Sequence, residues 1–125
     1  MLRGMAKPAS KWVLVVDDDE DTRELVVELL QVGGYLAVAA PGGTAALRMM
    51  GEDTPAMVLS DLSMSEMDGQ ELLTQTRALL GTATPPFVFA TGAHPSRLAE
   101  IAEPVLSKPY EVDELLDVVG RHCRS

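Results

Sequence analysis

Hydrophobic residues along the chain fall into two alternating patterns, which are short unbroken runs and longer segments with helical spacing. The first run, WVLVV over residues 12–16, is apolar at every position. Such a run is typical of a strand that is covered on both faces of a parallel sheet. Over residues 20–32 leucine and valine recur at helical intervals, which predicts a helix with its buried side formed by Leu25, Val26, Leu29 and Leu30.

The same alternation continues to residue 122. It predicts strands over residues 12–16, 35–40, 56–60, 87–90 and 104–107. It predicts helices over residues 20–32, 44–50, 70–80, 96–102 and 111–122, of which the third is expected to bury Leu72, Leu73, Leu79 and Leu80. Because strands and helices alternate through short loops, we expect an α/β fold with a doubly wound, five-stranded parallel sheet and five flanking helices.

Length and charge limit the classes of protein that this chain can be. Its 125 residues suffice for one domain, which we place at residues 12–123 after a disordered lead-in over residues 1–11. Ten lysines and arginines against 19 acidic residues give a net charge of −9, which argues against nucleic-acid and anionic-membrane partners. No run approaches the ~18 apolar residues of a membrane span, and no signal peptide is visible. We therefore expect a soluble, cytoplasmic protein.

Cysteine and histidine are too scarce for several common kinds of site. Cys123 is the only cysteine, so an intrachain disulfide and a thiolate zinc site are excluded. His94 and His122 are the only histidines, which leaves little room for a histidine-based metal site.

Charged or hydroxyl side chains follow four of the five predicted strands. Asp17 and Asp18 follow the first strand, Asp61 the third, Thr91 the fourth and Lys108 the fifth. Because function in an open parallel sheet collects at the carboxyl ends of the strands, we expect these side chains to converge. Each alone has an ordinary structural explanation, such as a helix cap or a surface cation. Their coincidence at four strand ends favours a shared site.

The charges of this set favour a divalent cation. Three aspartates packed together without compensation would raise the pKa of at least one of them. A magnesium ion and Lys108 would balance the three negative charges, and carboxylate oxygens are ligands that suit Mg²⁺. An aspartate beside Mg²⁺, with a lysine and a threonine to hold phosphoryl oxygens, is a minimal phosphoryl-transfer site. The chain has no glycine-rich phosphate loop, so the phosphoryl group is expected to arrive on a donor.

The acidic residues that follow Asp18 allow other interpretations. Asp19, Glu20 and Asp21 are expected to cap the following helix. A calcium loop is an alternative, because Asp17, Asp19, Asp21 and Glu28 occupy positions 1, 3, 5 and 12 of that pattern. Thr22 stands where this loop needs glycine, and a strand rather than a helix precedes it.

Four segments together resemble the receiver domain of two-component response regulators. They are VVDDD at residues 15–19, DLSMSEMDG at 61–69, ATG at 90–92 and SKPY at 107–110. The resemblance extends over residues 12–123 in order and spacing. It implies a flavodoxin-like fold and a signalling domain in a phosphorelay, which catalyses only its own phosphorylation and dephosphorylation and is not otherwise an enzyme.

Carried over by position, the resemblance also implies a role for each site residue. Asp61 would accept a phosphoryl group from a sensor histidine kinase or a histidine phosphotransfer protein. Asp18, Asp61 and the backbone carbonyl of Ser63 would hold Mg²⁺ directly, and Asp17 would contact it through water. The phosphoryl oxygens would be bound by Thr91 and Lys108.

The chain departs from the usual receiver pattern in three places. Ser65 stands where a proline is usual, and Val105 stands where many receivers have a switch aromatic. Thr91 and Lys108 are only 17 residues apart, which implies a shortened fourth helix of the kind found in receivers of hybrid kinases and in some stand-alone receivers. We expect a downstream protein partner to bind residues 92–104 and 111–118. The alternative function is a receiver-like module that binds its partner without phosphorylation.

Overall fold

The computed structural model describes residues 11–93 and 98–124. The predicted lead-in therefore lies outside the described residues, apart from Lys11, which is exposed. Within the described residues, no helix has the length and apolar character that crossing a membrane requires.

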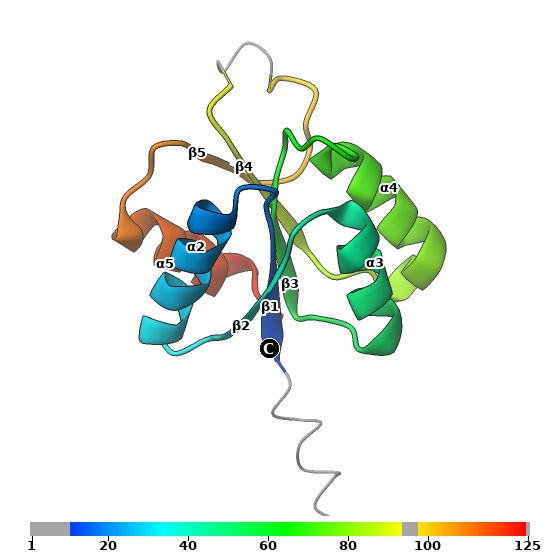
Figure 1. The fold of residues 1–125 in the computed structure, drawn as a ribbon, viewed down its shortest axis with the longest axis horizontal. Helices are drawn as coiled ribbons and strands as arrows, with labels where there is room; N and C mark the ends of the chain where they lie inside the picture. The colour runs from blue at the N-terminus through cyan, green and yellow to red at the C-terminus, as the bar shows by residue number, and fades with distance from the viewer. Residues whose placement is uncertain (1–10, 94–97, 125) are drawn as a thin grey trace, which may run out of the picture.

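Five parallel strands form one sheet in the order β2-β1-β3-β4-β5. The strands are β1 (Trp12–Val16), β2 (Leu36–Ala40), β3 (Met57–Asp61), β4 (Phe87–Thr91) and β5 (Val105–Ser107). The strand order reverses at β1, because β2 lies on one side of it and β3 on the other (Figure 1). The predicted doubly wound, five-stranded parallel sheet is confirmed.

Helices cover both faces of this sheet. The helices α2 (Glu20–Val32) and α5 (Val112–His122) lie on one face, and α3 (Gly43–Glu52) and α4 (Gly69–Leu80) lie on the other (Figure 1). A short 3-10 turn, η1 (Gly81–Ala83), follows α4. Each face has its own apolar core, and β1 contributes Val13 and Val15 to one core and Leu14 and Val16 to the other. This alternation explains why the β1 run has no polar position.

The expectation of five flanking helices is wrong for the described part of the chain, which contains four α-helices. Residues 94–97 lie outside the described residues, and 98–102 form a turn closed by the Ile101 N–H, which donates to the Leu98 carbonyl at 3.1 Å. The predicted helix over 96–102 has prolines close to both ends, and a segment of about two turns gains too little from its own hydrogen bonds to be stable.

Two leucines expected to be buried are exposed instead. Leu25 is 53% exposed and Leu79 is 50% exposed. In α2 the residues that enter the core are Val26 and Leu30, so Leu25 stands at the edge of the buried stripe. Leu79 lies in the last turn of α4, where Leu80 makes the core contact.

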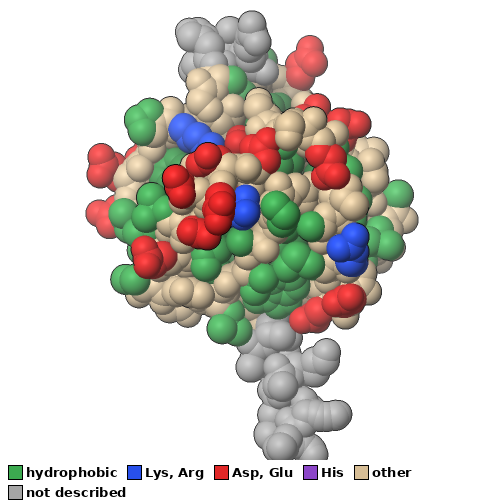
Figure 2. Space-filling model, in the orientation of Figure 1, with side chains coloured by type: hydrophobic (Ala, Val, Ile, Leu, Met, Phe, Trp, Pro, Cys, Tyr) green, Lys and Arg blue, Asp and Glu red, His purple; other side chains and the backbone are tan. Residues whose placement is uncertain are grey.

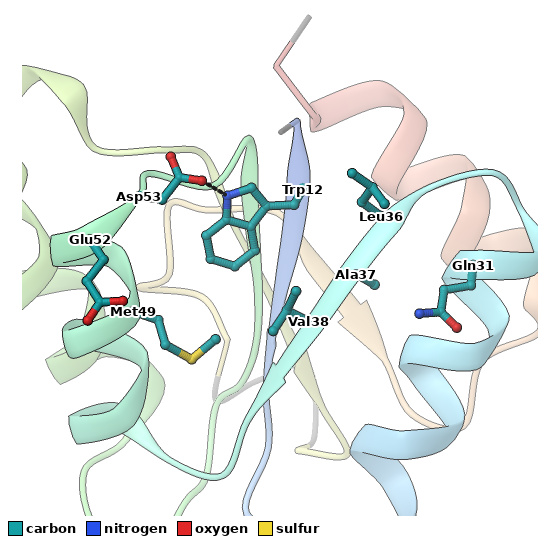
Figure 3. A pocket seen from close by; sticks show the side chains of 8 residues that line it. All are labelled: Trp12, Gln31, Leu36, Ala37, Val38, Met49, Glu52 and Asp53. Carbon is teal, nitrogen blue, oxygen red and sulfur yellow. Dashed lines mark hydrogen bonds between the residues drawn. The ribbon is translucent and has the colours of Figure 1, made fainter. Parts of the chain in front are cut away.

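An apolar hollow of about 380 Å³ lies at the end of the sheet opposite the carboxyl ends of the strands. Figure 3 shows Trp12, Val38 and Met49 around this hollow, with the Trp12 Nε1–H donating to Asp53 Oδ2 at 3.1 Å. On the side of the molecule that faces the viewer, the space-filling view shows hydrophobic side chains among acidic ones, with few basic side chains between them (Figure 2). The three carboxylates that could hold a metal ion lie at the other end of the sheet.

Candidate functional site

The strand order brings Asp17 and Asp61 to the same edge of the sheet. Asp17 directly follows β1, and its N–H extends the pairing by donating to the Ala40 carbonyl at 3.3 Å. Asp61 is the last residue of β3, the strand that pairs with β1 on the opposite side from β2. In open α/β sheets ligands bind outside the carboxyl ends of the strands, at the point where the strand order reverses, and here that point is β1.

Three carboxylates converge at this edge of the sheet. One oxygen each from Asp17, Asp18 and Asp61 lies within 4.8 Å of the other two. Asp17 is buried, Asp61 is half-buried and Asp18 is exposed, so the group opens to solvent on the Asp18 side. The structure thus brings together the three side chains that the sequence predicts as metal ligands.

Lys108 provides a positive charge to this group. Its Nζ lies 3.5 Å from Asp61 Oδ2 and 3.7 Å from Asp17 Oδ2. The β4–β5 pairing continues to this point, because the Lys108 N–H donates to the Thr91 carbonyl at 2.8 Å. Backbone pairing between the strand ends therefore fixes where the lysine side chain begins.

Thr91 ends β4, one residue beyond the position that pairs with Asp61. Its side chain is buried, and its Oγ1 accepts a hydrogen bond from the Ala93 N–H at 3.0 Å. The hydroxyl proton is not needed for that bond, so it can be donated to another group. The predicted role of Thr91 in holding phosphoryl oxygens stays a prediction.

Burial and crowding shift the acid–base properties of the site. Burial raises the pKa of Asp61 above its ordinary value; the Lys108 ammonium opposes this shift, and the Asp17 charge adds to it. Burial also raises the pKa of the Tyr110 phenol, with smaller contributions from the charges of Asp17 and Asp61. A single lysine therefore does not fully compensate for the loss of solvent around Asp61.

The loop that follows Asp61 is tied to two other elements. The Ser65 N–H donates to Asp18 Oδ2 at 2.9 Å, and Glu66 accepts hydrogen bonds from Thr44 at the start of α3. The Ser63 N–H lies 3.4 Å from Asp61 Oδ1, which places this backbone segment beside the acidic group. The contacts of Ser65 with Asp18 and of Glu66 with Thr44 could not be predicted from the sequence, because each joins residues 22 or more positions apart.

The loop closes at Gly69, the first residue of α4. Its N–H donates to the Leu62 carbonyl at 2.9 Å. A Cβ at this position would stand 2.8 Å from the Asp61 carbonyl oxygen and 2.8 Å from the Phe89 ring. Only glycine allows the helix to begin this close to Asp61.

Asp19 caps α2, as expected, and Glu20 and Asp21 lie in the first turn of that helix. Asp19 is the N-cap, its Oδ2 accepts from the Thr22 N–H at 3.0 Å, and hydrogen bonds from Thr22 lower the pKa of this carboxyl. Glu28 is exposed in the middle of α2. Asp19 and Glu28 therefore do not join Asp17 in the acidic group, and the calcium-loop interpretation gains no support.

A groove of about 630 Å³ opens beside Lys108, between α2 and the segment that leads into α5. Most of its lining is apolar, and Leu25 and Val112 are the exposed large hydrophobic residues in it. Lys108 belongs both to the groove and to the acidic group. The groove is therefore continuous with the site.

The chain is similar to known proteins over most of its length. The sequence profile of the response regulator receiver domain matches residues 13–120. An uncharacterised 14.6 kDa protein of Leptolyngbya boryana is 34% identical over 116 residues, which cover 89% of this chain and 88% of that protein. Other curated relatives are longer, and the chain spans between 24% and 47% of their length.

Solved structures agree with this match. The chemotaxis protein CheY4 of Vibrio cholerae superposes with a TM-score of 0.80 at 29% identity, covering 88% of this chain and 96% of that one. The response regulator TrrA of Thermotoga maritima, solved in complex with Mg²⁺ and BeF, has a TM-score of 0.77 at 28% identity, covering 89% of this chain and 97% of that one.

Proposed function

Because the chain belongs to the response regulator receiver domain family, we propose that it accepts a phosphoryl group on Asp61 and signals the change to a protein partner in the cytoplasm. The donor is the phosphohistidine of a sensor histidine kinase or of a histidine phosphotransfer protein. The observation that carries this proposal is the position of the half-buried Asp61 carboxylate, 3.5 Å from Lys108 and grouped with Asp17 and Asp18.

The transfer exchanges one bond to phosphorus for another. An oxygen of the Asp61 carboxylate attacks the phosphorus atom, the phosphorus–nitrogen bond breaks, and the imidazole leaves with the bonding electrons. The Lys108 ammonium, already beside Asp61, neutralises charge on the transferred group. The Thr91 hydroxyl donates a hydrogen bond to a phosphoryl oxygen. Hydrolysis of the acyl phosphate later restores the carboxylate.

The acidic group fits a magnesium ion. Its oxygen donors come from three carboxylates within 4.8 Å of one another, and hard cations such as Mg²⁺ prefer oxygen ligands. Asp18 and Asp61 would hold the ion with the Ser63 carbonyl, and Asp17 would contact it through water. When bound, Mg²⁺ supplies positive charge that stabilises the phosphoryl oxygens during transfer. The similarity to TrrA, solved with Mg²⁺ and BeF, supports this assignment.

A binding module that is never phosphorylated would gain nothing from this arrangement. Grouping three carboxylates at a partly buried site costs stability, as the raised pKa of Asp61 indicates. Such a cost is expected where charge is kept for chemistry. This favours a phosphoacceptor over the alternative of a constitutive interaction module.

The proposal is tested by the mass of the intact protein after incubation with acetyl phosphate and Mg²⁺. The wild-type chain should gain the mass of one phosphoryl group, and Asp61→Asn should gain none, because an amide cannot form the acyl phosphate. Equal labelling of the two proteins would refute the assignment.

The groove beside Lys108 is where a protein donor would contact the domain. A phosphohistidine that reaches Asp61 brings its own helix or loop over the neighbouring surface, and this surface is apolar and partly exposed at Leu25 and Val112. Burial of such residues is a usual source of binding energy between proteins. We therefore place the donor on the groove.

A charged substitution in the groove separates donor binding from chemistry. Leu25→Asp should slow phosphoryl transfer from a cognate histidine kinase about tenfold and leave uptake from acetyl phosphate unchanged. Leu79→Asp is the matched control, because Leu79 is exposed to a similar extent on α4, outside the groove. Equal rates of transfer from the kinase to both variants would mean that the donor does not bind in the groove.

A further inference from the structure

The loop between β3 and α4 is held by contacts that reach α3 as well as the acidic group. Helix α3 begins after Gly42, an N-cap residue that has no side chain with which to accept a hydrogen bond from the helix. The first N–H groups of a helix need acceptors from elsewhere. Glu66 supplies them from the loop. Its Oε1 accepts from the Thr44 N–H at 3.0 Å, and its Oε2 accepts from the Thr44 hydroxyl at 2.7 Å.

The two glycines at the start of α3 allow this close approach. A Cβ on Gly42 would stand 2.9 Å from Glu66 Oε1, and a Cβ on Gly43 would stand 2.4 Å from Met67 Sδ. The hydrogen bonds from Thr44 hold the pKa of Glu66 below its ordinary value, so the side chain is ionised when it caps the helix. Glu66 and Met67 therefore fasten the middle of the loop to α3.

The residue before Glu66 contacts the acidic group through its backbone. The Ser65 N–H donates to Asp18 Oδ2 at 2.9 Å. Asp18 is the exposed member of the three carboxylates, so its side chain is the one most free to turn away into solvent. The hydrogen bond from Ser65 keeps an Asp18 oxygen near those of Asp17 and Asp61.

We propose that Glu66 is a positioning residue for the metal site, an inference that rests on the proposed function. By capping α3, Glu66 fixes the backbone of Ser65, and the Ser65 N–H in turn orients the Asp18 carboxylate toward the place of the ion. Serine retains the N–H that a proline at this position would lack. Glu66 touches neither the ion nor the phosphoryl group. It sets the affinity for Mg²⁺ through its own hydrogen bonds to Thr44 and through the hydrogen bond between Ser65 and Asp18.

Titration of the whole chain with Mg²⁺, followed by calorimetry, tests this role. Glu66→Ala should weaken Mg²⁺ binding about fivefold, the size expected for loss of one capping interaction. Glu66→Gln retains a side-chain oxygen that can accept from Thr44, and it should recover most of the affinity. Thr44→Val, which loses only the hydroxyl donor, should fall between the wild type and Glu66→Ala. At saturating Mg²⁺, all three should take up phosphoryl from acetyl phosphate at nearly the wild-type rate.

Asp53→Ala is the matched control. It removes one negative charge, as Glu66→Ala does, and it removes one side-chain hydrogen bond where Glu66→Ala removes two, but at the opposite end of the sheet. Its affinity for Mg²⁺ should stay close to that of the wild type. In the metal-free protein, hydrogen exchange at the Ser65 amide should be faster in Glu66→Ala and unchanged in Asp53→Ala.

Three results would overturn the inference. They are an unchanged affinity in Glu66→Ala, an equal loss in Glu66→Ala and Asp53→Ala, and an unchanged exchange rate at the Ser65 amide. If the wild type binds Mg²⁺ and is phosphorylated on Asp61 while one of these results is found, only the role of Glu66 fails. If the wild type binds no Mg²⁺ or is not phosphorylated, the proposed function fails and this inference fails with it.

Discussion

At the carboxyl end of the sheet three carboxylates lie together and two of them contact Lys108, whereas at the opposite end Trp12 and Asp53 share one hydrogen bond beside an apolar hollow. Both ends join strands to helices through short loops. At the carboxyl end, burial raises the pKa of Asp61, so folding disfavours the ionised form of this carboxyl. At the opposite end, the Trp12 N–H has a partner and the polar group is satisfied.

The difference separates residues kept for chemistry from residues kept for stability. A charged group that is poorly compensated in the metal-free protein is ready to bind a cation and react. A satisfied hydrogen bond contributes to folding and offers no chemistry. Substitutions at the carboxyl end are therefore expected to reduce activity without reducing stability. Substitutions at the opposite end are expected to reduce stability without reducing activity.

Among variants that keep Asp61, the largest effect is expected when the metal site is broken. Asp18→Ala should reduce phosphoryl uptake at low Mg²⁺ about 100-fold, because the ion loses a direct ligand. Asp19→Ala is the control, since Asp19 caps α2 and is not a member of the acidic group. Uptake followed by intact mass at increasing Mg²⁺ measures both. If Asp19→Ala has the larger effect, the calcium-loop interpretation regains support.

A smaller effect is expected when the cation of the site is removed. Lys108→Met should slow uptake about tenfold, because the positive charge beside Asp61 is lost. Arg121→Met removes the same charge from α5, where Arg121 pairs with Asp117 and both side chains are more than half exposed. That control should leave the rate unchanged. Equal rates in the two variants would mean that Lys108 does not act on the transferred group.

Stability should change in opposite directions at the two ends of the sheet. Asp61→Asn should stabilise the metal-free protein by about 1 kcal/mol or less, because it removes a charge that burial disfavours, at a site that solvent and Lys108 partly screen. Asp53→Ala should destabilise it by about 1 kcal/mol, because the Trp12 N–H loses its acceptor. Urea unfolding measures both, and changes of the same sign would contradict the contrast between the two ends.

The smallest effect concerns pH. The folded-state pKa of Asp61 lies above its unfolded-state pKa. The wild type therefore loses stability as pH rises from the unfolded-state pKa through the folded-state pKa, and Asp61→Asn does not. The stability gap between them should be fully present at pH 7 and should shrink as pH falls toward about 4, the ordinary aspartate pKa. Urea midpoints at several pH values in EDTA measure the gap. A gap that widens toward low pH would reverse the assigned direction.

Most of the fold was predictable because the pattern of apolar residues is strong where both faces of a strand are covered. The first strand and the first helix were placed at their observed ends, and the other strands were placed to within one residue. The prediction failed over the described residues 98–102, because the segment is too short to form a stable helix, and for Leu25 and Leu79. The burial of these two leucines depends on which neighbour each helix packs against, and the sequence alone does not state that.

The acidic group was predictable because parallel strands bring their carboxyl ends to one edge. Asp17 and Asp61 could be paired without knowing any contact between them. The hydrogen bonds of Ser65 and Glu66 could not be predicted, because they depend on the path of an irregular loop between two distant elements. Backbone N–H donors also cannot be recognised from the sequence, because every residue except proline carries one.

The most direct test of the central claim is to locate the phosphoryl group in the unmutated chain. The protein is phosphorylated with acetyl phosphate and Mg²⁺, reduced with borohydride to convert the acyl phosphate to an alcohol, digested and sequenced by mass spectrometry. We expect the reduced residue to be at position 61 alone. Reduction at position 17 or 18, or a phosphoryl group found on a serine or threonine instead, would contradict it.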